Sequence, residues 1–466
     1  MLARLKHEED FREPPISQIV RPFQEFFRIE ATSGLLLVVC AAAALALANS
    51  PWKDAYFALW ETEVAIHFGH FGISMELLEW INEGLMAVFF FVVGLEIKRE
   101  VLIGELSTLR RAALPMMAAV GGMLVPAVIY FAINRGTPAA PGWGIPMATD
   151  IAFALGVLAL VGRRVPNGLK VFLAALAIVD DLGAVLVIAL FYTTGISASW
   201  LLVGAGVFAL MLLANRLGVR HPIPYAALGA LLWLTLLEAG VHATLAGVLG
   251  AMAIPAKARI DTDQFGRWSR RVLDEFEDCC MVEGGGHRDF DTTSRQRSLL
   301  QALEEAIHHA EAPLQRLEHA LAWPNAYVIV PLFALANAGV TIGGAFSQQI
   351  RQPVAIGVLL GLVVGKQVGI LVFAWAAVRL RLARLPLGVA WHHVYGAAWL
   401  GGIGFTISLF ITGLAFRAQP YGDTAKIAIL TASLIAGVGG YLLLRFAPGR
   451  EQPATTEATA AGGSVA

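Results

Sequence analysis

The chain repeats stretches of about 20 mostly apolar residues, the length an α-helix needs to cross the hydrocarbon core of a bilayer. Of all residues, 57% are hydrophobic and only 15% are charged, whereas soluble domains carry fewer apolar and more charged residues. A backbone in lipid must satisfy its own hydrogen bonds, so the pattern predicts an all-α polytopic membrane protein. The net charge of -1 leaves no general basic field, which argues against nucleic-acid binding.

Twelve stretches are predicted as membrane spans, which places both chain termini on the same side. Basic residues gather in cytoplasmic loops. Of the 34 Lys and Arg residues, 28 fall on the side of the termini, five on the other and Lys366 inside a span, so both termini are predicted to be cytoplasmic. The spans lie at about 32–50, 81–97, 113–133, 146–161, 169–193, 199–215, 223–238, 240–255, 324–344, 353–378, 391–416 and 425–445.

The segments outside the bilayer are an N-terminal arm, expected to be weakly structured, a long loop and a C-terminal tail rich in polar residues, expected to be disordered. The loop begins with a charged, Gly-rich half, expected to be mobile. Its second half repeats apolar residues at near-helical spacing from Leu300 to Leu321, which predicts an amphipathic helix on the cytoplasmic face. Arm, spans 1–8, loop, spans 9–12 and tail occupy residues 1–30, 31–255, 256–322, 323–445 and 446–466.

Four ionisable residues, Asp150, Asp180, Asp181 and Lys366, lie well inside spans. Each costs several kcal/mol there, which marks it as a candidate functional residue. Asp180 and Asp181 are adjacent, and neighbours on a helix point about 100° apart. One of them is expected to line a cavity while the other makes a different contact. Lys366 lies among three glycines spaced four residues apart, so it can approach another helix and pair with an aspartate. Neutralising a helix C-terminus is the alternative.

Two spans are expected to be interrupted. In span 4, Asp150 follows Thr149 and is flanked by Pro146 and Gly156. An opened helix there exposes a carboxylate, a hydroxyl and carbonyls, which are hard donors suited to Na⁺ or Li⁺; simple helix capping is the alternative. In span 11, the glycines of GGIGFTISLF (401–410) predict a second unwound stretch. Spans 3–5 and 10–12 run in opposite directions, which predicts two inverted three-helix repeats with discontinuous middle helices.

Eight segments, taken in order, resemble the NhaA-type Na⁺/H⁺ antiporters of bacterial inner membranes, a family already known for inverted repeats. The resemblance extends from about residue 30 to 445 and departs at Gln367, where the family pattern has proline, and in a longer loop before RLEHAL. The segments are GLMAVFFFVVGLEIKRE (84–100), ATDIAFALGVLAL (148–160), LAIVDDLGA (176–184), GVHATLAGV (240–248), RLEHAL (316–321), PLFALANAGV (331–340), VGKQVGI (364–370) and GGIGFTIS (401–408).

The resemblance implies export of Na⁺ or Li⁺ for external protons by electrogenic alternating access, serving sodium and pH homeostasis. It implies Asp181 as the principal Na⁺ ligand, Asp180 as its partner in proton exchange and a Lys366–Asp180 ion pair. It places Thr149 and Asp150 at the crossing of the unwound helices, with Asp150 balancing helix N-termini and Lys366 balancing C-termini. It also implies a homodimer in the inner membrane. No cofactor is expected, and no GxxxxGK[ST] nucleotide motif is present.

A second set comprises His242, Glu96, Glu100 and Glu318. The resemblance implies a pH-responsive cluster at the cytoplasmic funnel mouth, with His242 influencing the response, because histidine titrates near neutral pH. The alternative is that the acids at the helix end are solvated and the histidine is structural. Cys279 and Cys280 with a distant histidine make a poor metal-ligand set.

Other functional classes remain as alternatives. A different cation-coupled secondary transporter would share the buried charges. A channel needs a continuous lined pore, whereas buried opposite charges favour an occludable site. An intramembrane aspartyl protease needs two carboxylates that face each other, but Asp180 and Asp181 are neighbours and no GxGD occurs. A scaffold has no reason to keep buried charges. The sequence therefore predicts a secondary transporter rather than an enzyme.

Overall fold

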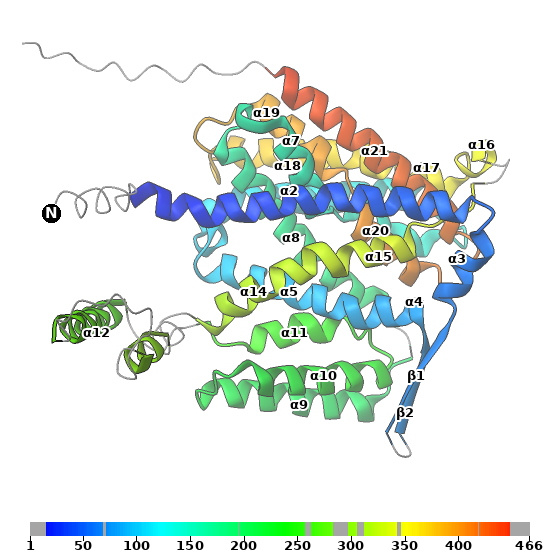
Figure 1. Cartoon of the computed structure of the whole chain (residues 1–466). Coiled ribbons are helices and arrows are strands. Elements are labelled where there is room, and N and C mark those ends of the chain that lie inside the picture. The colour runs from blue at the N-terminus through cyan, green and yellow to red at the C-terminus, as the bar shows by residue number, and fades with distance from the viewer. Residues whose placement is uncertain are drawn as a thin grey trace, which may run out of the picture.

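The computed structural model describes residues 15–68, 71–193, 195–256, 262–282, 297–304, 312–342, 346–417 and 419–447. Most of these residues are helical, and many of the helices lie side by side along a common direction (Figure 1). Eight of the helices are long and apolar enough to cross a bilayer. They span Leu77–Leu102, Leu109–Asn134, Ala140–Val161, Asn167–Phe191, Ala198–Arg216, Pro313–Asn337, Pro353–Arg379 and Gly422–Phe446.

Some of these eight membrane-length helices join two or three shorter elements, and the others are single α-helices. The second half of the first is α5 (Met86–Leu102), which follows the short α4 (Leu77–Glu79) and a π-helical turn, η1 (Trp80–Leu85). The others are α6 (Leu109–Asn134), η3 (Ala140–Met147) with α7 (Ile151–Val161), α8 (Asn167–Phe191), α9 (Ala198–Arg216), α14 (Pro313–Pro324) with η5 (Asn325–Ile329) and α15 (Val330–Asn337), α17 (Pro353–Leu360) with η6 (Gly361–Gly365) and α18 (Lys366–Arg379), and α21 (Gly422–Phe446).

Two further apolar helix pairs are bent at short breaks and can each count as one span. The first joins the apolar part of α2 (Pro15–Ala48) to α3 (Lys53–Trp60) at 116°, and the second joins α19 (Trp391–Gly401) to α20 (Phe405–Ala415) at 42°. Spans 7 and 8 correspond to the shorter α10 (Pro222–Glu238) and the nine-residue α11 (Leu245–Ala253). The described residues thus hold eight to ten membrane-length helices, and the number twelve stays a prediction.

Three segments outside the spans differ from expectation, and a fourth, the loop before span 2, has a structure that was not predicted from the sequence. The arm predicted to be weakly structured is helical from Pro15, where α2 begins. The half-loop predicted to be mobile contains α12 (Thr262–Val282). The RLEHAL segment belongs to α14, which continues into a membrane-length helix instead of ending as a separate surface helix. The loop before span 2 is a β-hairpin, with β1 (Glu63–Phe68) antiparallel to β2 (Phe71–Glu76) and Glu63 opposite Glu76. The predicted disordered tail lies outside the described residues beyond Ala447.

The two ends of the helix bundle differ in what they carry. The first turn of α2, the last turn of α21 and α12 lie at one end, while the hairpin and the short α16 (Phe346–Gln349) lie at the other (Figure 1). The start of α2 and the end of α21 therefore lie toward the same end of the bundle, and the side of the membrane that the chain termini occupy stays a prediction. Further short helical segments are the 3₁₀ turns η2 (Glu105–Ser107) and η4 (Gly162–Arg164) and residues 297–304, which fall in the second half of the long loop.

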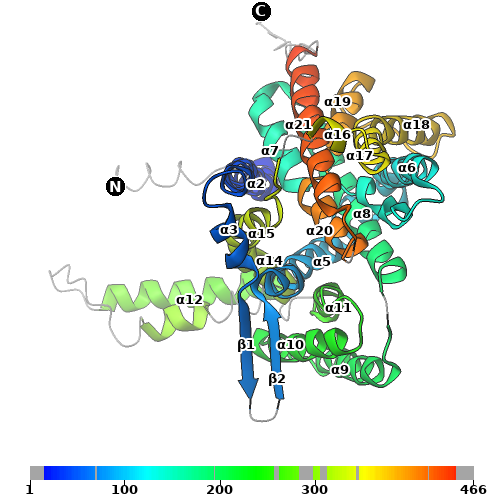
Figure 2. The ribbon, with the colours of Figure 1, turned by 90° about the vertical axis from the view of Figure 1, so that its right-hand side faces the viewer.

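The buried apolar residues form two clusters. The smaller one joins α5 to α9, α10 and α11, and these last three helices form a separate group in the end-on view (Figure 2). The larger cluster joins α2, α6, α7, α8 and the helices that follow α14. Within it, α6 and α18 pack so closely that a methyl group on Gly369 would overlap the Gly121 carbonyl oxygen. The predicted close approach through the glycines near Lys366 is therefore confirmed.

Candidate functional site

Both helices predicted to be interrupted are broken, and their breaks lie against each other. Residues 148–150 separate η3 from α7, and residues 402–404 separate α19 from α20. The Asp150 backbone N–H donates to the Ile403 carbonyl oxygen at 2.6 Å, and the Thr149 hydroxyl donates to the Gly401 carbonyl oxygen at 2.8 Å. Each break thus supplies polar groups that the other lacks, which is how irregular backbone is tolerated at membrane depth.

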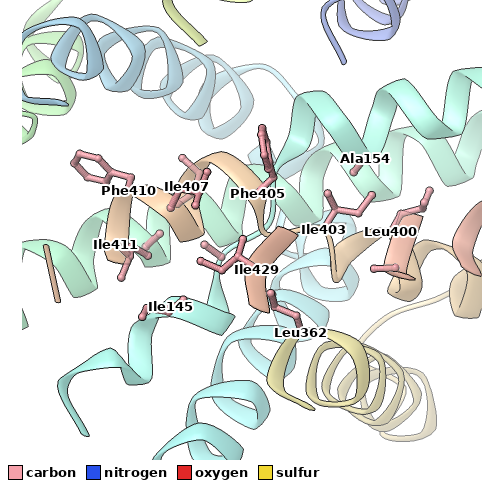
Figure 3. Close-up of a cluster of buried hydrophobic side chains, with 14 of the residues drawn as sticks. Ile145, Ala154, Leu362, Leu400, Ile403, Phe405, Ile407, Phe410, Ile411 and Ile429 are labelled. Atoms are coloured by element: carbon pink, nitrogen blue, oxygen red, sulfur yellow. The ribbon is translucent and has the colours of Figure 1, made fainter. Parts of the chain in front are cut away.

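Apolar side chains surround the crossing. Ile145, Leu362, Ile403 and Phe405 converge there from three segments far apart in the sequence (Figure 3). All four are at most 2% exposed. Polar groups inside such a shell must find partners within the protein, because an unpaired buried polar group costs free energy.

Asp150 joins the N-termini of two helices. Its Oδ1 accepts from the Phe153 backbone N–H of α7 at 2.9 Å. Its Oδ2 accepts from the Thr406 backbone N–H and hydroxyl of α20 at 3.1 and 2.7 Å. A helix N-terminus carries partial positive charge and favours a carboxylate. The position is the one implied for Asp150 by the family resemblance.

Lys366 forms the buried ion pair that the sequence suggested. Its Nζ lies 2.6 Å from Asp180 Oδ2, and both side chains are fully buried. The same ammonium donates to the Thr149 hydroxyl at 2.9 Å. Lys366 on α18 is thereby connected to α8 through Asp180 and to the first broken helix through Thr149. Within the described part of the chain, the ammonium makes no hydrogen bond to a helix C-terminal carbonyl.

Asp181 has a different environment from its neighbour. It lines an enclosed cavity of about 30 Å³ together with Asp150, Thr149, Thr406 and Glu96. This volume admits a water molecule or a small cation. Asp181 is 3% exposed, and its Oδ1 has no hydrogen-bond partner among the described residues. The two adjacent aspartates therefore divide as expected, with Asp180 on the lysine and Asp181 on a cavity.

The oxygen atoms around this cavity suit an alkali cation. Carboxylates, hydroxyls and the side chain of Asn325 line it, and hard cations prefer oxygen ligands. The described residues contain no group of three or more His, Cys, Asp or Glu placed to hold a metal ion. Carboxylate and hydroxyl oxygens line the cavity without His or Cys, and such hard donors fit an alkali cation better than a transition metal.

The second predicted set separates into three places. Glu96 lies on the wall of the Asp181 cavity. Glu100 and Glu318 lie on either side of Arg99, with oxygen-to-nitrogen distances of 3.2 and 3.1 Å. His242 is not part of this acidic cluster.

His242 lies in a cluster at the other end of α5 that the sequence did not suggest. Its Nδ1 is 3.6 Å from Glu83 Oε1, and its Nε2 is 2.8 Å from the Tyr192 carbonyl oxygen. Arg417 donates to Glu83 at 2.9 Å, and the Ala243 backbone N–H donates to its other oxygen at 3.2 Å. Glu83 is 5% exposed. The sequence signal that points to Glu83 is its position two residues inside predicted span 2, where an acidic side chain is unusual.

Comparisons with known proteins assign the chain to a family. The profile of the Na⁺/H⁺ antiporter 1 family matches residues 24–444. The chain belongs to this family. One similar protein is the Na⁺/H⁺ antiporter NhaA of Oleidesulfovibrio alaskensis. It is 51% identical to this chain over 92% of this chain and 95% of that protein.

Two other relatives share similar lengths. The Na⁺/H⁺ antiporter NhaA of Koribacter versatilis is 49% identical over 96% of each chain. The Na⁺/H⁺ antiporter NhaA 2 of Syntrophotalea carbinolica is 47% identical over 94% of this chain and 99% of that protein. Family membership together with the apolar helices identifies the chain as a multi-pass membrane protein of a transporter family.

Proposed function

We propose that this protein is a Na⁺/H⁺ antiporter that also accepts Li⁺, and that it exports cytoplasmic sodium in exchange for external protons. The observation that carries the proposal is the cavity at the helix crossing. It presents Asp181 beside a buried Asp180–Lys366 ion pair. Asp181 lines a small cavity while its neighbour Asp180 is paired with a lysine, so Asp181 is the carboxylate available to bind either a proton or Na⁺.

In the proposed cycle, Na⁺ enters from the cytoplasm and binds Asp181, which gives up its proton. Na⁺ near Asp180 weakens the attraction of Asp180 for Lys366. The two broken helices then reorient so that the cavity opens outward. External protons displace Na⁺ by binding to both Asp181 and Asp180. After the site has turned back to the cytoplasm, Asp180 releases its proton there and forms the ion pair with Lys366 again, and the next Na⁺ releases the proton of Asp181. Two protons thus enter for each Na⁺ exported, which makes exchange electrogenic and sensitive to membrane potential.

The arrangement of the chain in the membrane supports this direction. The end of the bundle with the first turn of α2 and the last turn of α21 is the one predicted to face the cytoplasm by its excess of Lys and Arg (Figure 1). We assign the protein to the bacterial inner membrane with both termini cytoplasmic, and to sodium and pH homeostasis. The homodimer rests on the family resemblance.

The test uses everted membrane vesicles with a respiration-generated pH gradient and a pH-sensitive dye, from pH 6.5 to 9. Addition of Na⁺ or Li⁺, but not K⁺, should collapse the gradient. The Asp181→Asn variant should lose this response, and Asp54→Asn, an exposed aspartate in α3, should keep it. No response of the wild type to any cation would refute antiport. A response to K⁺ alone would favour the alternative of a different cation-coupled transporter.

A further inference from the structure

A basic pocket lies at the end of the bundle predicted to face the cytoplasm. Four arginines line it: Arg110 and Arg111 from the first turn of α6, and Arg381 and Arg384 from the loop that follows α18. The cavity has a volume of about 630 Å³. Its inner wall is apolar and includes Phe172 of α8. It lies outside the broken helices and shares no lining residue with the Asp181 cavity.

The positive charge of this basic pocket is not neutralised within the described part of the chain. None of the four arginines forms an ion pair with a carboxylate there, and Glu105 is the one acidic residue on the wall. Four guanidinium groups around one cavity repel one another. A bound anion would relieve that repulsion, and guanidinium matches a phosphate group with paired N–H donors.

Two backbone features work against arginine at these positions. The first turn of a helix carries partial positive charge and disfavours cations, yet α6 begins with Leu109, Arg110 and Arg111. Arg381 has φ 61° and is the one non-glycine residue of the described chain with positive φ. Such a conformation costs about 1 kcal/mol or more and is found where the surroundings hold a residue for function. Both costs are understandable if the arginines bind an anion.

Exposed leucines beside the arginines indicate the kind of anion. Leu109, Leu382 and Leu387 are 86%, 54% and 96% exposed. Leu382 lines the basic pocket, and Leu109 and Leu387 are each adjacent in sequence to a residue that lines it. Apolar side chains next to cations suit the level of the lipid headgroups, where acyl chains cover the leucines and phosphates meet the arginines. Basic pockets between membrane helices on the cytoplasmic side are suited to anionic lipid headgroups.

We propose that the basic pocket binds the phosphate headgroup of an anionic phospholipid, with the acyl chains lying over the neighbouring leucines. The lipid joins the start of α6 to the loop after α18, and these two helices carry the close glycine packing next to Lys366. The proposal rests on the pocket alone and does not depend on the transported ion.

The experiment titrates delipidated, purified full-length protein with phosphatidylglycerol and follows its melting temperature, with native mass spectrometry to count retained lipids. Phosphatidylcholine and free glycerol phosphate at matched ionic strength are the comparison ligands. The Arg381→Gln/Arg384→Gln variant should bind phosphatidylglycerol about 30-fold more weakly, from roughly 1 kcal/mol per arginine. Arg135→Gln/Arg351→Gln, which changes two exposed arginines at the other end, should bind like wild type.

A second variant keeps the test decisive if the first one does not fold. Arg110→Gln/Arg111→Gln removes the other half of the basic pocket and should show a similar loss. Equal stabilisation by phosphatidylglycerol and phosphatidylcholine would overturn the proposal, as would equal phosphatidylglycerol binding by the pocket variants and the control. Stabilisation by free glycerol phosphate as large as that by the lipid would overturn the assignment to a lipid and indicate a soluble anion.

Discussion

Replacing Lys366 with methionine tests whether the buried ion pair stabilises the protein. Lys366 Nζ and Asp180 Oδ2 are 2.6 Å apart, and both side chains have no exposed surface. Removing the ammonium leaves the Asp180 carboxylate buried without its counter-charge. Breaking a buried pair in this way costs about 3–5 kcal/mol. Methionine keeps much of the volume of the lysine chain, so the cavity contribution is small.

The second half of this test is the double variant Lys366→Met/Asp180→Asn. It removes both charges and should recover most of the lost stability, because the unfavourable state is the single unpaired charge and not the absence of the pair. Lys53→Met, in the exposed first turn of α3, is the control and should melt like wild type. A protonated Asp180 needs no counter-charge, so the deficit of Lys366→Met should be smaller at pH 5.5 than at pH 8.5.

The assay is thermal unfolding of purified protein in detergent, followed by intrinsic tryptophan fluorescence. We expect Lys366→Met and Asp180→Asn each to lower the melting temperature by roughly 5 °C or more. The double variant should lie closer to wild type than either single variant. Additive losses in the double variant would refute the reasoning, since they would show that the two residues stabilise the fold independently.

Three further predictions concern packing and hydrogen bonds, each measured by the same melting assay. Thr406→Val removes the 2.7 Å hydrogen bond to Asp150 and should lower the free energy of unfolding by about 1.5–3 kcal/mol. The control Thr412→Val loses a hydrogen bond to the Ser408 carbonyl within α20 and should lower it by about 1 kcal/mol. Equal losses would argue against a role of Asp150 in joining two helices. Gly369→Ala should lower the free energy of unfolding by about 1–3 kcal/mol, because the new methyl group overlaps the Gly121 carbonyl. The control Gly206→Ala has no atom within 4 Å of the new methyl group and should be neutral or stabilising. An unchanged melting temperature of Gly369→Ala would contradict the close packing of α6 and α18. Glu83→Gln should lower the free energy of unfolding by about 1–3 kcal/mol, because it weakens the contacts of a buried carboxylate. Arg417→Gln should lower it by less than 1 kcal/mol, because the Arg417 side chain is 63% exposed. A larger loss for Arg417→Gln would contradict the argument that burial decides the contribution.

The charged centre of the site was predictable because its cost in a membrane is high. Asp150, Asp180, Asp181 and Lys366 stood out against long apolar runs, and the adjacency of Asp180 and Asp181 required them to face different partners. The glycines of span 11 and Pro146 in span 4 indicated where the helices open. The structure places these groups together at the crossing of the two broken helices.

Other features escaped because their sequence signals are short or shared with ordinary loops. The hairpin has strands of six residues each, too few for alternation to stand out beside a predicted span. The helix that begins at Pro15 continues a polar arm into an apolar span, and composition alone did not show that one helix covers both.

The cluster around Glu83 was missed for a different reason. Its members come from the start of span 2 and from the loops near His242 and Arg417, which are far apart in the chain. An acid near a span end is usually solvated, so Glu83 alone gave no reason to expect a buried contact. The resemblance implied only that His242 influences the pH response, and it did not indicate that the histidine contacts Glu83.

Thr149 has a consequence that extends beyond its own two hydrogen bonds. Its hydroxyl accepts from the Lys366 ammonium and donates to the Gly401 carbonyl at the end of α19. One oxygen atom therefore connects the Lys366–Asp180 ion pair to the second broken helix. In the proposed cycle Lys366 leaves Asp180, and the hydroxyl then loses the bond that it accepts while the bond that it donates to Gly401 is not broken by that step. We therefore expect Thr149, a side chain that does not ionise, to keep the two broken helices connected while the ion pair opens.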